Sequence, residues 1–184
     1  MNLIILGPQG SGKGTQAKLI AQKYNLTHIS TGEWLRKEID SGSDLGKNIK
    51  LIIENGELVS DDILFAILEK TPLKNGNGFI LDGTPRNLAQ AQAFDKIFTK
   101  TGLVLDKVIN ITLPRSESIK RMLHRAEIEG RADDNLVTIN KRLAVFDEET
   151  LPVIDFYRSQ GKVIDVDGQP NVDTIFADIC LKLG

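Results

Sequence analysis

One glycine-rich segment has the residue types and the spacing of a phosphate-binding loop. A short apolar stretch, residues 3–6, leads into the run Gly7-Pro8-Gln9-Gly10-Ser11-Gly12-Lys13-Gly14-Thr15, and an amphipathic helical pattern follows. Glycines let the backbone wrap with its N–H groups pointing inward, and a helix start adds positive dipole. Lys13 would bring a charge to the outer phosphates, and Thr15 is placed to orient magnesium. The segment predicts a nucleotide site at Gly10, Ser11, Gly12, Lys13, Gly14 and Thr15.

The place of Thr15 and the lack of a guanine motif narrow the class. Gly14 stands between the lysine and the hydroxyl residue, as in nucleoside monophosphate kinases. The segment at residues 140–143 begins like a guanine-reading motif but lacks the aspartate that would accept the donors of guanine. The sequence therefore disfavours a switch GTPase. The structural alternative is a glycine-rich turn that only connects a strand to a helix.

Several arginines lie near expected loops or helix starts, although the chain carries a formal net charge of -2. Phosphoryl transfer spreads negative charge over several oxygens, and one guanidinium group can bind two of these oxygens at once. Any single arginine could instead be an ordinary surface ion-pair partner. Because they share this placement in a chain of net negative charge, the sequence favours local anion binding by Arg36, Arg86, Arg121, Arg125, Arg131 and Arg142.

The composition indicates one globular domain and disfavours several other classes. Of its 184 residues, 41% are hydrophobic and 26% charged, and the pI is near 5.7. No global basic field is present to hold nucleic acid or anionic lipid. No apolar stretch approaches the ~20 residues of a membrane span, and no signal segment is evident, so we expect a cytoplasmic protein. With one cysteine, Cys180, and two histidines, we expect no structural zinc and a metal that arrives with the substrate.

Apolar runs alternate with helical patterns along the chain, which predicts an α/β fold around a parallel sheet. The expected strands are residues 3–6, 27–29, 78–81, 107–111 and 162–166. About 48 residues separate the second strand from the third and have the pattern of short helices, which predicts an insert. Residues 126–132 join two helical patterns and contain Gly130, which predicts a short mobile lid.

Taken with the glycine-rich loop, four further segments occur in the order found in adenylate kinases, and the whole chain resembles that family. They are Ser30-Thr31-Gly32, Gly56-Glu57-Leu58-Val59, Asp82-Gly83-Thr84-Pro85-Arg86 and Arg131-Ala132-Asp133-Asp134. The resemblance implies a three-layer P-loop nucleoside monophosphate kinase fold, with a five-stranded parallel sheet, in a single domain, residues 1–184. Its parts would be a core at 1–29, 60–125 and 133–184, a helical monophosphate-binding insert at 30–59 and a short lid at 126–132.

The resemblance also implies a reaction: reversible transfer of the γ-phosphoryl group from Mg-ATP to AMP, giving two ADP, for adenine nucleotide homeostasis. The partners would be ATP, AMP and ADP, with no nucleic acid or membrane, and the chain would act as a monomer. The implied catalytic residues are Lys13, Arg86, Arg125, Arg131 and Arg142. Besides the loop, the implied ATP contacts are Arg121, Arg125, Gln169 and Pro170.

The implied acceptor site draws on several separated segments. AMP would contact Thr31, Gly32, Arg36, Glu57, Leu58, Val59, Gly83, Arg86, Gln90, Arg131 and Arg142. Thr15 and Asp82 would hold magnesium, largely through water and the ATP phosphates. The amide of Gln90 suits adenine, because it can accept from the amino group and donate to a ring nitrogen. We also expect Thr31 to be a helix N-cap, with Glu33 in the first turn.

The chain departs from the family pattern at three positions. Gln9 replaces a usual proline, which should loosen the empty loop. Thr84 replaces a usual aromatic residue, which could weaken the AMP site or widen its choice of base. Asn87 resembles the residue of pyrimidine monophosphate kinases, so a UMP/CMP kinase is one alternative, which Gln90 disfavours. A nucleotide-binding regulatory module without turnover is another, and small-acceptor kinases of the shikimate type would not require the segments from Thr31 to Gln90.

Overall fold

A five-stranded parallel sheet forms the centre of the protein. The structure is a computed structural model that describes residues 1–60, 62–63, 77–129 and 135–184. The strands are β1 (Asn2–Leu6), β2 (Thr27–Ser30), β3 (Phe79–Asp82), β4 (Lys107–Thr112) and β5 (Val163–Asp167), in the order β2-β3-β1-β4-β5. In register, Ile5 of β1 lies opposite Asp82 of β3 and Ile109 of β4. All five expected strands are confirmed, with ends that shift by one residue.

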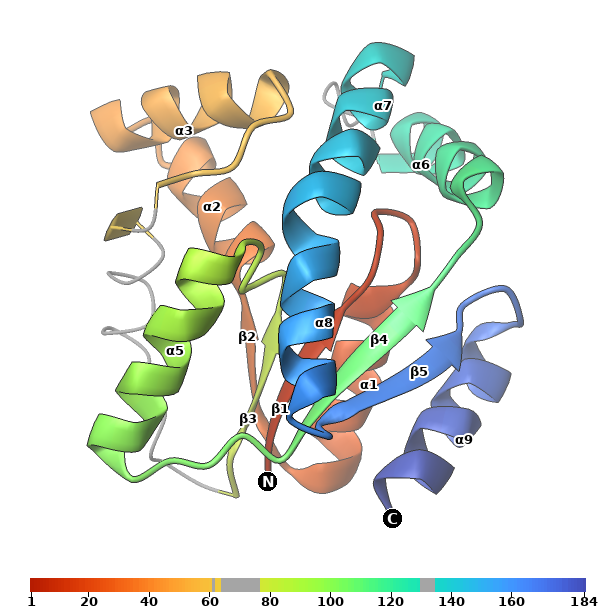
Figure 1. The fold of residues 1–184 in the computed structure, drawn as a ribbon. Helices are drawn as coiled ribbons and strands as arrows, with labels where there is room; N and C mark the ends of the chain where they lie inside the picture. The colour runs from red at the N-terminus through yellow and green to blue at the C-terminus, as the bar shows by residue number, and fades with distance from the viewer. Residues whose placement is uncertain (61, 64–76, 130–134) are drawn as a thin grey trace.

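Helices cover both faces of the sheet, so the expected three layers are confirmed (Figure 1). Side chains alternate along a strand, and in β1 Leu3 and Ile5 join one apolar cluster while Ile4 and Leu6 join the other. The first cluster packs against α1 (Lys13–Tyr24) and α9 (Val172–Leu183). The second packs against α5 (Leu88–Thr101) and α8 (Leu151–Ser159).

A separate helical unit, residues 31–59, stands beside the sheet and has an apolar core of its own. It contains α2 (Thr31–Asp40) and α3 (Asp44–Glu54), and we call it the α2–α3 unit. Leu35, Ile49 and Val59 are buried together, and Trp34 packs against them. Because this core is distinct from the two clusters of the sheet, the unit can pack as a body of its own.

The N-cap of α2 differs from the expected residue. Ser30 accepts a hydrogen bond from the backbone N–H of Glu33 over 3.4 Å, so Ser30 is the cap and Thr31 is the first residue of the helix. The prediction of Thr31 as N-cap was wrong by one position. Two adjacent hydroxyl residues fit the cap equally well in sequence, and in the fold Thr31 turns toward the end of β3 instead.

A long helical arm lies along the other side of the molecule. It consists of α6 (Arg115–Glu129), α7 (Leu136–Val145), a π-helical turn η1 (Phe146–Thr150) and α8. Helix α6 therefore includes residues 126–129 of the range expected as a lid, and residues 130–134 lie outside the described part of the chain. Within the described residues, no helix is long and apolar enough to cross a membrane.

The π-helical turn has a local cause in the sequence. The N–H of Leu151 bonds to the carbonyl of Phe146, five residues back. Pro152 follows at the start of α8, and proline has no N–H and collides with the carbonyl four residues earlier. A wider turn before the proline relieves that collision while α7 and α8 stay in one continuous rod (Figure 1).

Candidate active site

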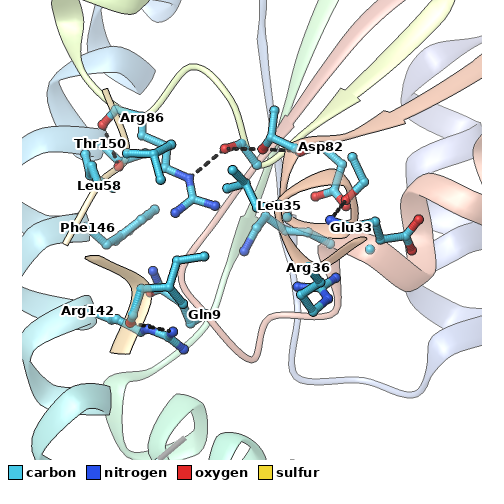
Figure 2. A pocket seen from close by; sticks show the side chains of 18 of the residues that line it. Gln9, Glu33, Leu35, Arg36, Leu58, Asp82, Arg86, Arg142, Phe146 and Thr150 are labelled. Carbon is cyan, nitrogen blue, oxygen red and sulfur yellow. Dashed lines mark hydrogen bonds between the residues drawn. The ribbon is translucent and has the colours of Figure 1, made fainter. Parts of the chain in front are cut away.

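A cleft of about 610 Å³ opens where β1 and β3 end. Its walls come from the loop after β1, the α2–α3 unit, the turn after β3, and the arm from α6 to η1 (Figure 2). In open parallel sheets, ligands bind beyond the carboxyl ends of the strands, where neighbouring crossovers diverge. The cleft occupies that position. In the strand order β2-β3-β1-β4-β5, the connection that leaves β1 runs toward β2 at one edge, and the connection that leaves β3 runs toward β4 on the other side.

The loop after β1 presents the start of α1 to the cleft. Gly12 is the N-cap at φ 87°, no side chain caps the helix, and the first turn holds no acid. Gly7 has φ 147°, and a Cβ there would lie 2.4 Å from the carbonyl oxygen of Ile111. Glycine is required at that close approach of loop and sheet. The backbone N–H groups at the start of α1, with their positive dipole, suit an anion.

Lys13 carries the charge of this loop. Its Nζ donates to the carbonyl oxygen of Pro8 over 2.9 Å. Burial lowers the pKa of Lys13 to about 8; the nearby Arg86 and Arg125 lower it too, while Asp82 opposes the shift. An ammonium group whose charge is disfavoured in the empty cleft gains most from an anionic ligand.

Asp82 stands at the end of β3 with 8% of its surface exposed. Burial would raise the pKa of its carboxyl, but the His28 imidazole, Lys13 and Ser30 together hold that pKa below its usual value. Asp82 Oδ2 lies 3.6 Å from His28 Nε2, and a Cβ on Gly14 would lie 3.4 Å from it. An ionised carboxylate is thus fixed against the first turn of α1, near the exposed Thr15. Both residues offer oxygen, the donor that magnesium prefers.

Arginines from four other parts of the chain also line the cleft: Arg36 of α2, Arg86 of the turn after β3, Arg121 and Arg125 of α6, and Arg142 of α7. Burial lowers the pKa of Arg86, Asp82 opposes that shift, and the charges of Arg142 and Arg36 lower the pKa further. Among the described residues, eight cationic side chains and four carboxylates line the cleft. Cations that disfavour each other's charge in the empty site are stabilised by a bound polyanion.

Three of the four carboxylates lie next to lysines. Glu33 lies 2.7 Å from Lys18, Glu54 lies 3.8 Å from Lys50, and Glu57 lies 3.0 Å from Lys141. These side chains are all at least 40% exposed. Asp82 is the buried acid among those that line the cleft. The interior is therefore positive, which suits a polyanionic ligand.

Gly83 marks the point where the turn after β3 meets α2. Its φ is 82°, and a Cβ there would lie 3.2 Å from Thr31 Oγ1 and 3.3 Å from an Arg86 guanidinium nitrogen. Thr31 Oγ1 donates to the carbonyl oxygens of Asp82 and Gly83 over 3.4 and 3.3 Å. A hydroxyl and a guanidinium group thus converge beside a residue that has no side chain.

The structure brings most of the expected site residues into one cleft. Ser11 is fully buried and does not line the cleft. Gln169 and Pro170 do not line it either, although Arg121 donates to the carbonyls of Gly168 and Gln169 over 2.9 and 3.1 Å. Arg131 lies outside the described residues. The expected residues that line the cleft are Gly10, Gly12, Lys13, Gly14, Thr15, Thr31, Gly32, Arg36, Glu57, Leu58, Val59, Asp82, Gly83, Arg86, Gln90, Arg121, Arg125 and Arg142.

Three residues that the sequence analysis linked to the choice of base have different surroundings from those expected. Gln90 Oε1 accepts a hydrogen bond from the backbone N–H of Arg86 over 2.7 Å. The side-chain carbonyl of Gln90 therefore holds the chain at Arg86, whereas it was expected to accept from the amino group of adenine. Asn87 caps α5 by accepting from the N–H of Gln90 over 2.9 Å. Thr84 is fully buried and does not line the cleft, so it makes no direct contact with a bound base.

Several cleft residues had no signal in the sequence analysis, and two of them come from the π-helical turn. The π-helical turn places Phe146 and Thr150 on the cleft wall (Figure 2). Neither belongs to a recognisable motif. Pro152 was a possible signal for a change in helix geometry, but it does not indicate which side chains the wider turn exposes.

Comparison with known proteins gives a consistent result over the whole chain. A family model described as "Adenylate kinase" matches residues 5–162. The chain is similar to an adenylate kinase of Stenotrophomonas maltophilia, with 46% identity over 97% of both chains. It is similar to one of Xanthomonas campestris, with 45% identity over 100% of both chains. It is also similar to one of Phocaeicola vulgatus, with 42% identity over 97% of this chain and 96% of that one.

Proposed function

The chain belongs to the adenylate kinase family, and from this premise we propose that it transfers the γ-phosphoryl group reversibly from Mg-ATP to AMP, giving two ADP. One observation carries the proposal: a phosphate-binding loop and a group of arginines from other elements line different walls of one cleft. A site for a single nucleotide would not need both walls. Two phosphate chains held end to end would need them.

The donor nucleotide is assigned to the loop and α1. The N–H groups at the helix start and the Lys13 ammonium would hold the outer phosphates of ATP. Arg121 is fixed by Glu117 over 2.9 Å and by the carbonyls of residues 168 and 169, so its guanidinium group forms a rigid rim for adenine. Gln169 and Pro170 do not line the cleft, but they adjoin Arg121 and would contact the adenine of ATP there.

The acceptor is assigned to the other wall. Arg36 and Arg86 would bind the phosphate of AMP beside Thr31 and Gly83. The segment 57–59 would offer its backbone to the base, as the family resemblance implies. Gln90 could read adenine with its amide nitrogen, since its carbonyl oxygen serves Arg86.

Transfer between the two nucleotides rests on charge rather than on a proton acceptor. The transferred phosphoryl group would be surrounded by Lys13, Arg86, Arg125 and Arg142. The sequence analysis adds Arg131 to this set. Phosphoryl transfer leaves most catalysis to positioning and electrostatic stabilisation. Mg-ATP is the substrate form, and the metal would neutralise phosphate charge. Asp82 and Thr15 fit it by donor chemistry, largely through water.

Closure of the α2–α3 unit over the acceptor would exclude water, which otherwise competes for the phosphoryl group. Three contacts join that unit to α7. Thr138 Oγ1 donates to the carbonyl of Glu54 over 3.4 Å, an Arg142 guanidinium nitrogen donates to the carbonyl of Ile53 over 3.4 Å, and Lys141 pairs with Glu57. We assign the lid to residues 126–132. One chain supplies both walls, so a monomer suffices, working on the nucleotide pool of the cytoplasm.

The test is phosphoryl transfer from Mg-ATP to AMP, UMP, CMP and GMP in parallel, with ADP formation followed with and without a chelator. The proposal expects a strong preference for AMP that disappears when the chelator is added. A preference for UMP or CMP would revive the pyrimidine alternative, whose support from Asn87 is weakened by the capping role of that residue. Nucleotide binding without transfer to any acceptor would indicate a regulatory module.

A further inference from the structure

Three hydrogen bonds fix the residue Arg86. Its backbone N–H donates to Gln90 Oε1 over 2.7 Å, and its side-chain Nε donates to the carbonyl of Gly83 over 2.6 Å. Its own carbonyl accepts from Thr150 Oγ1 over 2.8 Å (Figure 2). The first two partners belong to the same stretch of chain. Thr150 is 64 residues further along, so it ties the turn after β3 to the helical arm.

The π-helical turn is what places Thr150 there. Each residue of an α-helix turns the chain by about 100°, so one additional residue in the turn before α8 changes which side chains face the cleft. Thr150 is 6% exposed, and Phe146 of the same turn also lines the cleft. Single π turns are frequent at functional sites, and this one has its only cleft-facing hydroxyl bound to Arg86.

The charges in the cleft explain why Arg86 needs such a fixed position. Burial disfavours the charged form of Arg86 in the empty site, and the positive charges of Arg142 and Arg36 disfavour it further. Repulsion between these guanidinium groups would displace Arg86 if its backbone were not held. The rod of α7, η1 and α8 carries Arg142 directly and holds Arg86 through Thr150. The same rod thus sets the relative positions of two guanidinium groups.

We propose that Thr150 is a positioning residue of the acceptor site, whose hydroxyl holds the carbonyl of Arg86 and thereby aims its guanidinium group at the acceptor phosphate. This proposal rests on the proposed function. Loss of the hydroxyl alone leaves a buried carbonyl without its donor, and the turn that carries Arg86 then relaxes. Among the described residues, the hydroxyl of Thr150 bonds to the carbonyl of Arg86 and not to the loop after β1, so binding of the acceptor should weaken more than binding of the donor.

The experiment compares three variants of the full chain. Thr150→Val keeps the shape but removes the hydroxyl, and Thr150→Ser keeps the hydroxyl. Tyr157→Phe is the matched control, because Tyr157 Oη of α8 donates to the carbonyl of Ala91 in α5 over 3.5 Å, away from the cleft. We expect Thr150→Val to raise the KM for AMP roughly tenfold and to leave the KM for ATP within about twofold of wild type.

Thr150→Ser should return the KM for AMP to within about threefold of wild type, and Tyr157→Phe should change neither KM. An unchanged KM for AMP in Thr150→Val, an equal rise in both KM values, or a serine variant as impaired as valine would each overturn the proposal. Calorimetric titration with AMP alone reads the same effect without turnover. If the wild-type chain binds AMP but transfers no phosphoryl group, the proposed reaction is wrong and the role of Thr150 can still be tested by binding. If the wild-type chain does not bind AMP, both the proposed reaction and the role of Thr150 are wrong.

Discussion

The two walls of the cleft are built in different ways. The wall that we propose for the donor phosphates is one continuous segment, in which nine residues from Gly7 to Thr15 supply the turn, the helix start and the lysine. The acceptor wall is assembled from the α2–α3 unit, the turn after β3 and the π-helical turn, joined by hydrogen bonds such as the one between Thr150 and Arg86. A local motif therefore determines the first wall, and tertiary contacts determine the second.

The largest effect that this comparison predicts comes from the donor wall. Lys13→Met removes the ammonium group and keeps a side chain of similar length. Turnover should fall by about 10³-fold or more, because a charge placed where negative charge develops accounts for several kcal/mol of stabilisation. Circular dichroism should show an unchanged fold. Near-normal turnover in the purified variant would remove Lys13 from the mechanism.

Arg86→Ala tests the acceptor wall. The variant loses the guanidinium group expected on the AMP phosphate, and kcat/KM for AMP should fall about 100-fold, while the KM for ATP changes little. Arg121→Ala is the matched control, since we assign that arginine, which is held by the carbonyls of residues 168 and 169, to the donor nucleotide. This variant should affect ATP instead. If both variants damaged the use of both nucleotides equally, the division into two walls would be wrong.

The same division explains how much the sequence could predict. The strands follow from apolar alternation and were predicted to within one residue at their ends, while the three layers were implied by the family resemblance. The prediction of the donor loop rests on a contiguous motif. Ser30 was missed as the cap of α2 because two hydroxyl residues stand side by side. The bond from Thr150 to the carbonyl of Arg86 was missed because it depends on which distant parts of the chain meet in the fold. The bond from Arg86 to Gln90 is local, but no sequence motif marks it.

Lys13 also predicts a pH dependence that separates activity from stability. Its pKa is about 8 in the folded protein and 10.5 when the chain is unfolded. Above pH 8 the ammonium loses its charge, so kcat/KM for ATP should fall by up to about tenfold per pH unit. Between pH 8 and 10.5 the unfolded state binds more protons, so the contribution of Lys13 to the free energy of unfolding rises with pH.

Lys13→Met gives the control for this prediction, because it lacks the titrating group. Between pH 8 and 10.5, the free energy of unfolding should change with pH at different rates in the wild type and the variant. Outside this range, Lys13 should cause no difference between the two slopes. Denaturant titrations at several pH values measure the slope. Equal slopes in both proteins would mean that burial does not shift the pKa of Lys13.

The smallest predicted effect concerns the contact between the α2–α3 unit and α7. Glu57 and Lys141 lie 3.0 Å apart but are 54% and 45% exposed, so the pair contributes at most ~1 kcal/mol and weakens with salt. Glu57→Gln should raise the KM for AMP only about two- to threefold, because an open unit binds the acceptor less well. Glu54→Gln is the control, since it breaks the pair with Lys50 inside α3.

A charge swap decides what Glu57 does. Glu57→Lys and Lys141→Glu should each raise the KM for AMP, and the double variant should restore it, because the pair is re-formed with its signs exchanged. Should Glu57 instead contact AMP directly, as the family resemblance implies, the double variant would stay impaired, because the lysine at position 57 cannot replace a carboxylate acceptor. The KM for AMP at low and high salt separates these outcomes, since only a pair on the surface loses its effect as salt is added.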